Sequence, residues 1–82
     1  DLRERLMAKT IYCARAFWRR DGRLVGGQVH QFLNAERALE GGEILAKSAA
    51  GASVFSLTGE PDVDFWGEPI LLAAIGDAPL EV

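Results

Sequence analysis

Apolar residues recur along this 82-residue chain in short runs that are separated by glycine, proline and charged residues. Residues 10–18 hold several aromatic and β-branched side chains and contain no glycine or proline, which predicts a strand. The pair Asp21-Gly22 follows, and it is typical of a type I′ turn because that turn needs positive φ at both positions. We therefore expect residues 24–32 to return as the second strand of an antiparallel hairpin.

The turn fixes which residues of this hairpin face each other, because a two-residue turn sets the pairing register. Continuous pairing places Trp18 opposite Val25 and Cys13 opposite His30. The face with the smaller side chains at its middle, suited to a helix lying across it, carries Tyr12, Ala14, Ala16, Trp18, Val25, Gly27 and Val29. The other face carries Ile11, Cys13, Arg15, Phe17, Leu24, Gly26, Gln28, His30 and Phe32.

Apolar positions three and four residues apart predict one helix over residues 35–50. Asn34 is a favourable N-cap for this helix and Gly51 is a favourable terminator. Gly42 falls on the apolar stripe, where it would let the helix and sheet backbones approach closely. Gly41 has no such role, and Ile44 falls opposite the stripe, so the pattern is compatible with a kink at Gly41 or with an exposed Ile44.

Residues 52–58 and 70–75 predict two further strands, and the loop over residues 59–69 between them could hold one helical turn. The order β-β-α-β-β defines a single α+β domain over residues 1–82. We expect a four-stranded, mainly antiparallel sheet with one helix packed on one face. This layout resembles that of many short bacterial α+β domains, and no motif in it is specific to one family.

The last predicted strand, residues 70–75, is apolar at every position. A strand of this kind is typically buried on both faces, yet one helix covers only one face of the sheet. Either the N-terminal segment, with Leu2 and Leu6, or a second copy of the chain must cover the other face. We therefore expect a homodimer through the open sheet face. The apolar residues of that predicted dimer face are Ile11, Cys13, Phe17, Leu24 and Phe32.

A single cysteine, Cys13, cannot form an internal disulfide, which favours a reducing, cytoplasmic setting. The N-terminus lacks the apolar core of a signal peptide, and the longest apolar run is too short to span a bilayer, so no membrane is expected as a partner. Met7 is the only methionine. We expect native translation to start there, which makes residues 1–6 an extension. Residues 1–9 as a whole are expected to form an extension or a short helix before the first strand.

Charge is divided unevenly along the chain. Residues 1–33 hold seven basic and three acidic residues, whereas residues 34–82 hold two basic and nine acidic residues. The predicted turn carries three arginines: Arg19, Arg20 and Arg23. Beside Phe17 and Trp18 they could grip phosphates while an aromatic ring stacks on a base, so nucleic-acid binding through this turn is the alternative function. The net charge of −3 counts against that alternative, because nucleic-acid-binding domains are usually basic.

No set of residues predicts an enzyme, a cofactor site or a metal site. The loop before the last strand carries four carboxylates, Glu60, Asp62, Asp64 and Glu68. Their spacing is not that of a calcium-binding loop. Cys13 and His30 face each other in the predicted register, but one cysteine and one histidine do not complete a metal site, and no orienting group for catalysis accompanies them. We therefore expect a protein-interaction or accessory module whose partner is a second copy of the chain or another protein.

Overall fold

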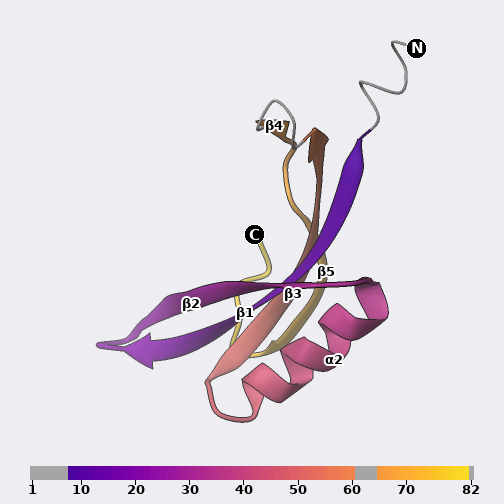
Figure 1. Ribbon diagram of the computed structural model, residues 1–82. Coiled ribbons are helices and arrows are strands. Elements are labelled where there is room, and N and C mark those ends of the chain that lie inside the picture. The colour runs from indigo at the N-terminus through magenta and orange to yellow at the C-terminus, as the bar shows by residue number, and fades with distance from the viewer. Residues whose placement is uncertain (1–7, 61–64, 82) are drawn as a thin grey trace, which may run out of the picture.

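The computed structural model describes residues 8–60 and 65–81. Its elements are β1 (Lys9–Arg20), β2 (Arg23–Phe32), α2 (Ala35–Ala46), β3 (Gly51–Glu60), β4 (Phe65–Trp66) and β5 (Ile70–Gly76). The strands form one sheet in the order β2-β1-β3-β4, and β5 pairs with β3 on the same edge as β4. Every strand pair is antiparallel, and α2 lies on one face (Figure 1). The predicted α+β class is confirmed, and the two-residue strand β4 is an addition to the predicted elements.

The turn between β1 and β2 adopts the predicted conformation. Asp21 has φ of 52° and Gly22 has φ of 78°, the positive values that a type I′ turn requires. Near the turn the register is also the predicted one, since Trp18 pairs with Val25 and Arg20 pairs with Arg23. Both strands extend closer to the turn than predicted.

Further from the turn the predicted register is wrong, because β2 contains a bulge. Phe17 pairs with Gly26 and Arg15 pairs with Val29, so Gly27 and Gln28 together oppose Ala16. A bulge of this kind shifts the strand by one residue and exchanges the two faces of everything beyond it. The changed pairs are Cys13 with Gln31, Ala14 with His30, and Tyr12 with Phe32. Cys13 and His30 are therefore not partners, and Phe32 lies on the α2 side of the sheet instead of on the predicted dimer face.

Large side chains on both faces explain why two glycines stand at the bulge. The Arg15 guanidinium lies against Gly26, where a Cβ would fall 2.5 Å from its Nε, and the Nε–H donates to the Gly27 carbonyl at 2.8 Å. On the other face the Trp18 ring lies against Gly27, whose Cβ would fall 2.5 Å from Cζ3. The same Arg15 guanidinium stands 5.5 Å from the centroid of the Phe17 ring. Any larger residue at these two positions would displace one of these side chains.

The helix begins as predicted and ends earlier. The Asn34 side chain accepts a hydrogen bond from the Arg37 backbone N–H at 2.8 Å, which confirms the N-cap. The helix stops at Ala46, four residues before the predicted end, and Gly51 belongs to β3. The chain leaves the helix through residues 47–49, whose backbone N–H groups donate to carbonyls three residues back, and the Ala50 backbone N–H then donates to the Phe17 carbonyl at 2.9 Å. A residue bonded to β1 in this way cannot continue the helix.

The two helix glycines both allow close packing. A Cβ on Gly42 would fall 2.5 Å from Cγ2 of the fully buried Val54, so the predicted close approach of helix and sheet is confirmed. A Cβ on Gly41 would meet the Phe32 ring, so a glycine is needed there to let this ring pack against the helix. The predicted register placed Phe32 on the other side of the sheet and therefore gave Gly41 no such role. The helix is continuous from 35 to 46, and Ile44 is exposed at 65%.

A small core lies between α2 and the sheet. Its fully buried residues are Ala14, Ala38 and Val54, one each from β1, α2 and β3. Partly buried residues surround them: Tyr12, Phe32, Leu45, Ala73 and Ile75. Small side chains at the centre and larger ones at the rim bring the helix axis close to the middle of the sheet.

The prediction that the last strand is buried on both faces is wrong. β5 lies at the edge of the sheet, and its side chains are half-buried or exposed, with Ile70 exposed at 62% and Leu72 at 40%. Its pairing with β3 shifts where Val54 pairs with Ala73 and Phe55 with Leu71, which leaves Leu72 without a partner on β3. The apolar sequence of β5 therefore reflects an apolar surface of the single chain.

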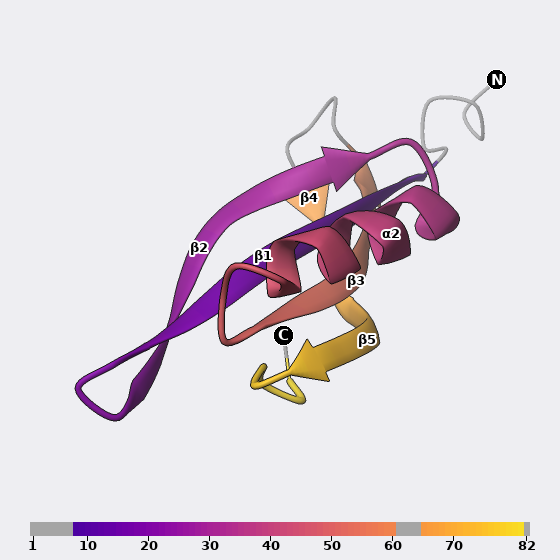
Figure 2. The ribbon, with the colours of Figure 1, turned by 90° about the horizontal axis from the view of Figure 1, so that it is seen from below.

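After β5 the chain turns sharply onto the side of the sheet that α2 does not cover (Figures 1 and 2). Gly76 makes this turn with φ of 61°, and the Asp77 backbone N–H donates to the Ala50 carbonyl at 3.0 Å. The backbone at Asp77 passes directly over Gly51, where a Cβ would fall 2.6 Å from the Asp77 nitrogen.

In the loop before β5, residues 65–66 form β4 instead of part of a helical turn. Residues 61–64 of that predicted turn, and residues 1–7 of the predicted N-terminal extension, lie outside the described residues.

The substitution Gly51→Ala is expected to lower the free energy of unfolding by about 1–3 kcal/mol, the usual cost of overpacking. The new Cβ would meet backbone atoms of Ile75 and Asp77, which cannot rotate away as a flexible side chain can. Urea denaturation followed by circular dichroism measures the change. Gly67→Ala is the matched control, because its Cβ would meet one backbone atom, the Thr58 carbonyl oxygen, at 3.2 Å. Equal stability of the Gly51→Ala protein and the unmodified protein would contradict the close crossing.

Candidate interaction surfaces

The turn end of the β1–β2 hairpin extends beyond the helix as an arm, residues 18–25 (Figures 1 and 2). Alternation along the strands divides the arm between two sides of the sheet. The cross-strand pairs Trp18–Val25 and Arg20–Arg23 share the side on which α2 lies, which we call the α2 side of the arm. The pair Arg19–Leu24 lies on the opposite side. The three arginines of the predicted interaction surface are therefore separated, with one on one side and two on the other.

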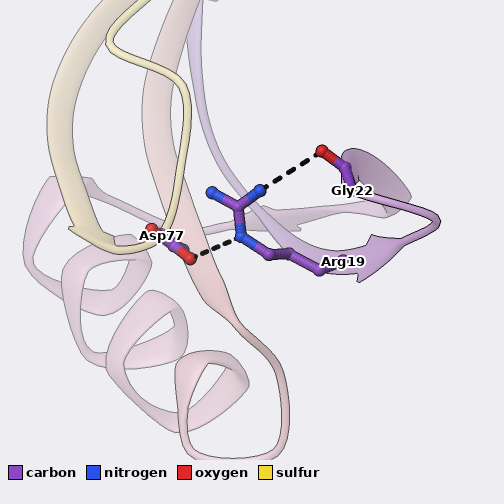
Figure 3. Close-up of polar contacts among 3 residues, drawn as sticks. All are labelled: Arg19, Gly22 and Asp77. Atoms are coloured by element: carbon purple, nitrogen blue, oxygen red, sulfur yellow. Dashed lines mark hydrogen bonds and ion pairs between the residues drawn. The ribbon is translucent and has the colours of Figure 1, made fainter.

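Arg19 is paired with the C-terminal segment. Its Nε–H donates to the Asp77 carboxylate at 2.8 Å, and its Nη1 donates to the Gly22 carbonyl at 3.5 Å (Figure 3). The hydrogen bond and the positive charge of Arg19 hold the pKa of the Asp77 carboxyl below its ordinary value. Both side chains are about half exposed, so salt screens this pair and its contribution to stability is modest. The pair joins the basic hairpin to the acidic second half of the chain.

Arg20 and Arg23 stand directly opposite each other at the tip of the arm. Both are exposed to solvent. Like charges that face each other across two strands repel, which makes this pair a local source of positive potential. Beside them Trp18 is 41% exposed, and its indole N–H donates to the Ser48 carbonyl at 3.3 Å. The α2 side of the arm thus combines two exposed arginines with an aromatic ring that is held in place.

The centre of the predicted dimer face is closed within one chain. Cys13 is 1% exposed, and Phe55, on the neighbouring strand, is 5% exposed. Burial raises the pKa of the Cys13 thiol, which opposes its use as a nucleophile. Ile11, Phe17 and Leu24, three of the predicted face residues, are half-buried. Phe32, as described above, lies on the other side of the sheet.

A second apolar surface lies along β5, where sequence reasoning did not place one. It consists of Leu39, Ile70 and Leu72, which we call the β5 surface. Leu39 belongs to it by helix geometry: residues advance by about 100° around a helix, so Gly41 and Leu39 lie on opposite flanks of Gly42. Gly41 faces Phe32 of β2, and the flank with Leu39, which is 39% exposed, therefore faces β5. The run of apolar residues at 70–75 was the sequence signal for this surface.

Other kinds of site receive no support from the described residues. Among residues 8–60 and 65–81, no three His, Cys, Asp or Glu side chains are grouped to hold a metal ion, and no cavity opens. Two of the four loop carboxylates, Asp62 and Asp64, lie outside these ranges. With 12 residues, α2 falls short of a membrane span, and the described segments contain no other candidate helix.

Comparisons of the chain with protein-family models, curated proteins and solved structures find no match.

The Asp77 carboxyl is expected to titrate below the ordinary range of an aspartate, and Arg19→Gln is expected to return its pKa to that range. A depressed pKa in the folded state stabilises the fold above the pKa of the unfolded chain, and this gain is lost as pH falls through the folded pKa. A pH titration of the side-chain carboxyl by NMR measures both effects. Arg20→Gln is the matched control and should leave Asp77 unchanged. Identical Asp77 titrations in the unmodified and Arg19→Gln proteins would contradict the ion pair.

Proposed function

We propose that this chain is a protein-interaction domain that forms a symmetric homodimer through the β5 surface. The observation that supports the proposal is the exposure of an edge strand whose residues 70–76 include no charged side chain. Edge strands in soluble proteins usually carry charged residues or proline, which prevent other chains from pairing with them. An edge that is apolar and exposed is typical of a strand that meets a partner.

A second copy is the partner that best complements this surface. Two antiparallel copies of β5 would be related by a two-fold axis normal to the sheet, so each copy would present the same residues to the other. Their helices would then lie on the same side of the combined sheet, and the Leu39 flanks would face each other. Ile70, Leu72 and Leu39 of one copy would therefore meet apolar side chains of the other, with the exposed Glu36 and Glu43 of α2 at the rim of the contact.

The bulge at Leu72 limits how such a dimer can pair. Regular backbone pairing between two copies would be confined to residues 73–76, and side-chain packing around Ile70 and Leu72 would supply the remaining contact. A stable interface usually buries roughly 800 Å² on each partner, which is more than three side chains provide. We therefore place the dissociation constant in the micromolar range, with the backbone edge and the flank of α2 completing the contact.

The β5 surface fits this role better than the open sheet face that the sequence favoured. Cys13 and Phe55 are already buried at the centre of that face, and the exposed Val29 lies at its margin on the edge strand β2, so the centre offers a partner little apolar surface. The buried single cysteine supports a reducing, cytoplasmic setting as part of the same proposal. In that setting the dimer would be held by side-chain packing and backbone hydrogen bonds.

The substitution Ile70→Lys is expected to weaken self-association by at least about tenfold, because it places two charges in the apolar interface. Sedimentation equilibrium between micromolar and hundred-micromolar concentrations measures the change. Ile44→Lys is the matched control: Ile44 is 65% exposed, against 62% for Ile70, and lies on the outer side of α2. The control should leave the dimer intact, and circular dichroism checks that both variants fold.

Two results would refute the proposal. One is an unmodified chain that remains a monomer at hundred-micromolar concentration. The other is a dimer that Ile44→Lys weakens as strongly as Ile70→Lys, since that would locate the interface away from β5.

A further inference from the structure

We infer that the α2 side of the arm binds single-stranded nucleic acid, with Arg20 and Arg23 on the phosphates and Trp18 stacked on a base. This inference is independent of the proposed dimer, because it uses a different part of the sheet. It also narrows the surface that the sequence indicated. Arg19 is excluded, since it lies on the opposite side of the arm and is bonded to Asp77.

The arginine pair supplies the anion-binding part of this surface. Arg20 and Arg23 are cross-strand partners on one face, so their guanidinium groups extend from neighbouring backbone positions. Their mutual repulsion falls when an anion is bound between them, which makes the free hairpin a better anion receptor than two isolated arginines. Asp21 is the one acidic residue of the arm. At the base of the arm, Lys47 directly precedes Ser48, the residue to which the Trp18 indole is bonded.

The aromatic part of the surface favours a nucleic acid over an acidic peptide. Trp18 packs against the Gly27 backbone and is bonded to the Ser48 carbonyl, so the ring is fixed while a substantial part of it stays exposed. A fixed ring loses little conformational entropy when a base stacks on it. Stacking on aromatic side chains is the usual way in which proteins hold unpaired bases, whereas an acidic peptide gains nothing from it.

The net charge of the chain sets the strength of binding that is expected. The protein carries a net charge of −3, and most of its acidic residues lie beyond residue 34, outside the hairpin. The opposing field is screened over about 10 Å at 0.1 M salt, so the arm acts mainly through its own charges. Binding by one arm should therefore be weak and should depend measurably on salt.

Fluorescence anisotropy of a labelled 15-nucleotide single-stranded DNA of mixed sequence, titrated with the protein between 50 and 200 mM salt, tests the inference. Two phosphate contacts predict a slope of about −1.4 for log K against log salt, and removal of either contact should reduce it by about 0.7. Arg20→Ala and Arg23→Ala should each show that reduction. Trp18→Leu keeps an apolar side chain over Gly27 and should weaken binding about tenfold with an unchanged slope.

The matched control is Arg37→Ala, which removes an exposed arginine from α2 and should leave binding unchanged. Three results would overturn the inference. They are the absence of binding at 50 mM salt, equal weakening by Arg37→Ala and Arg20→Ala, and equally tight binding of a glutamate peptide of matched charge. The Ile70→Lys protein should still bind the DNA through the single arm of each monomer, so failure of the proposed dimer would leave this test intact.

Discussion

The structure depends on the pairing of β1 with β3. Nine consecutive pairs join these strands, from Lys9–Gly59 to Phe17–Gly51, without a shift in register. The ladders on either side of it, β1–β2 with eight pairs and β3–β5 with six, each contain a shift in register. The central ladder therefore decides which residues face α2, and it places Ala14 opposite Val54 at the centre of the core. The helix approaches the sheet closely at Gly42, because Gly42 has no side chain and the small side chains of Ala14 and Val54 lie beneath it.

Features that depend on neighbouring residues could be predicted from the sequence. The type I′ turn at Asp21-Gly22, the cap at Asn34 and the existence of the four main strands all follow from local backbone preferences. The end of the helix could not be predicted, because it depends on a hydrogen bond between Ala50 and Phe17. The same holds for the bulge in β2, which depends on Arg15 and Trp18 lying over Gly26-Gly27. A register without this bulge places Phe32 on the wrong side of the sheet.

The order of the strands in the sheet could not be predicted from the sequence either, and this affected where the apolar interaction surface was expected. β5 is the more apolar strand, yet β3 is the central one, and β3 buries two serines, Ser53 and Ser56. A hydrophobic count therefore assigns the wrong strand to the centre. Burial of serine is tolerated because no buried side-chain polar atom among the described residues lacks a hydrogen-bond partner. Residues 70–75 do form an apolar strand, as the sequence predicts. Their position at the edge of the sheet depends on the order of the strands, which the sequence does not reveal.

The division of charge along the chain takes a different meaning once the hairpin sides are known. Alternation in the arm assigns Arg19 to one side and Arg20 with Arg23 to the other, and that separation follows from the turn alone. The partner of Arg19 does not, because Asp77 reaches it only through the crossing of the tail over Gly51. The three arginines of the arm therefore form one ion pair within the chain, between Arg19 and Asp77, and one pair of exposed charges, Arg20 and Arg23.

The two proposed surfaces are compatible, and together they explain how weak contacts could be effective. β1 and β3 separate β2 from β5 in the sheet, so a second copy against β5 would leave both arms uncovered. A two-fold dimer would then carry two identical arms. When one arm holds a nucleic-acid strand, the second binds it at an effective concentration set by the strand length between them, which can strengthen binding by about 10²–10⁴ without any new contact. Self-association would thus convert a pair of arginines and one tryptophan, too few for firm binding in a monomer, into a divalent surface.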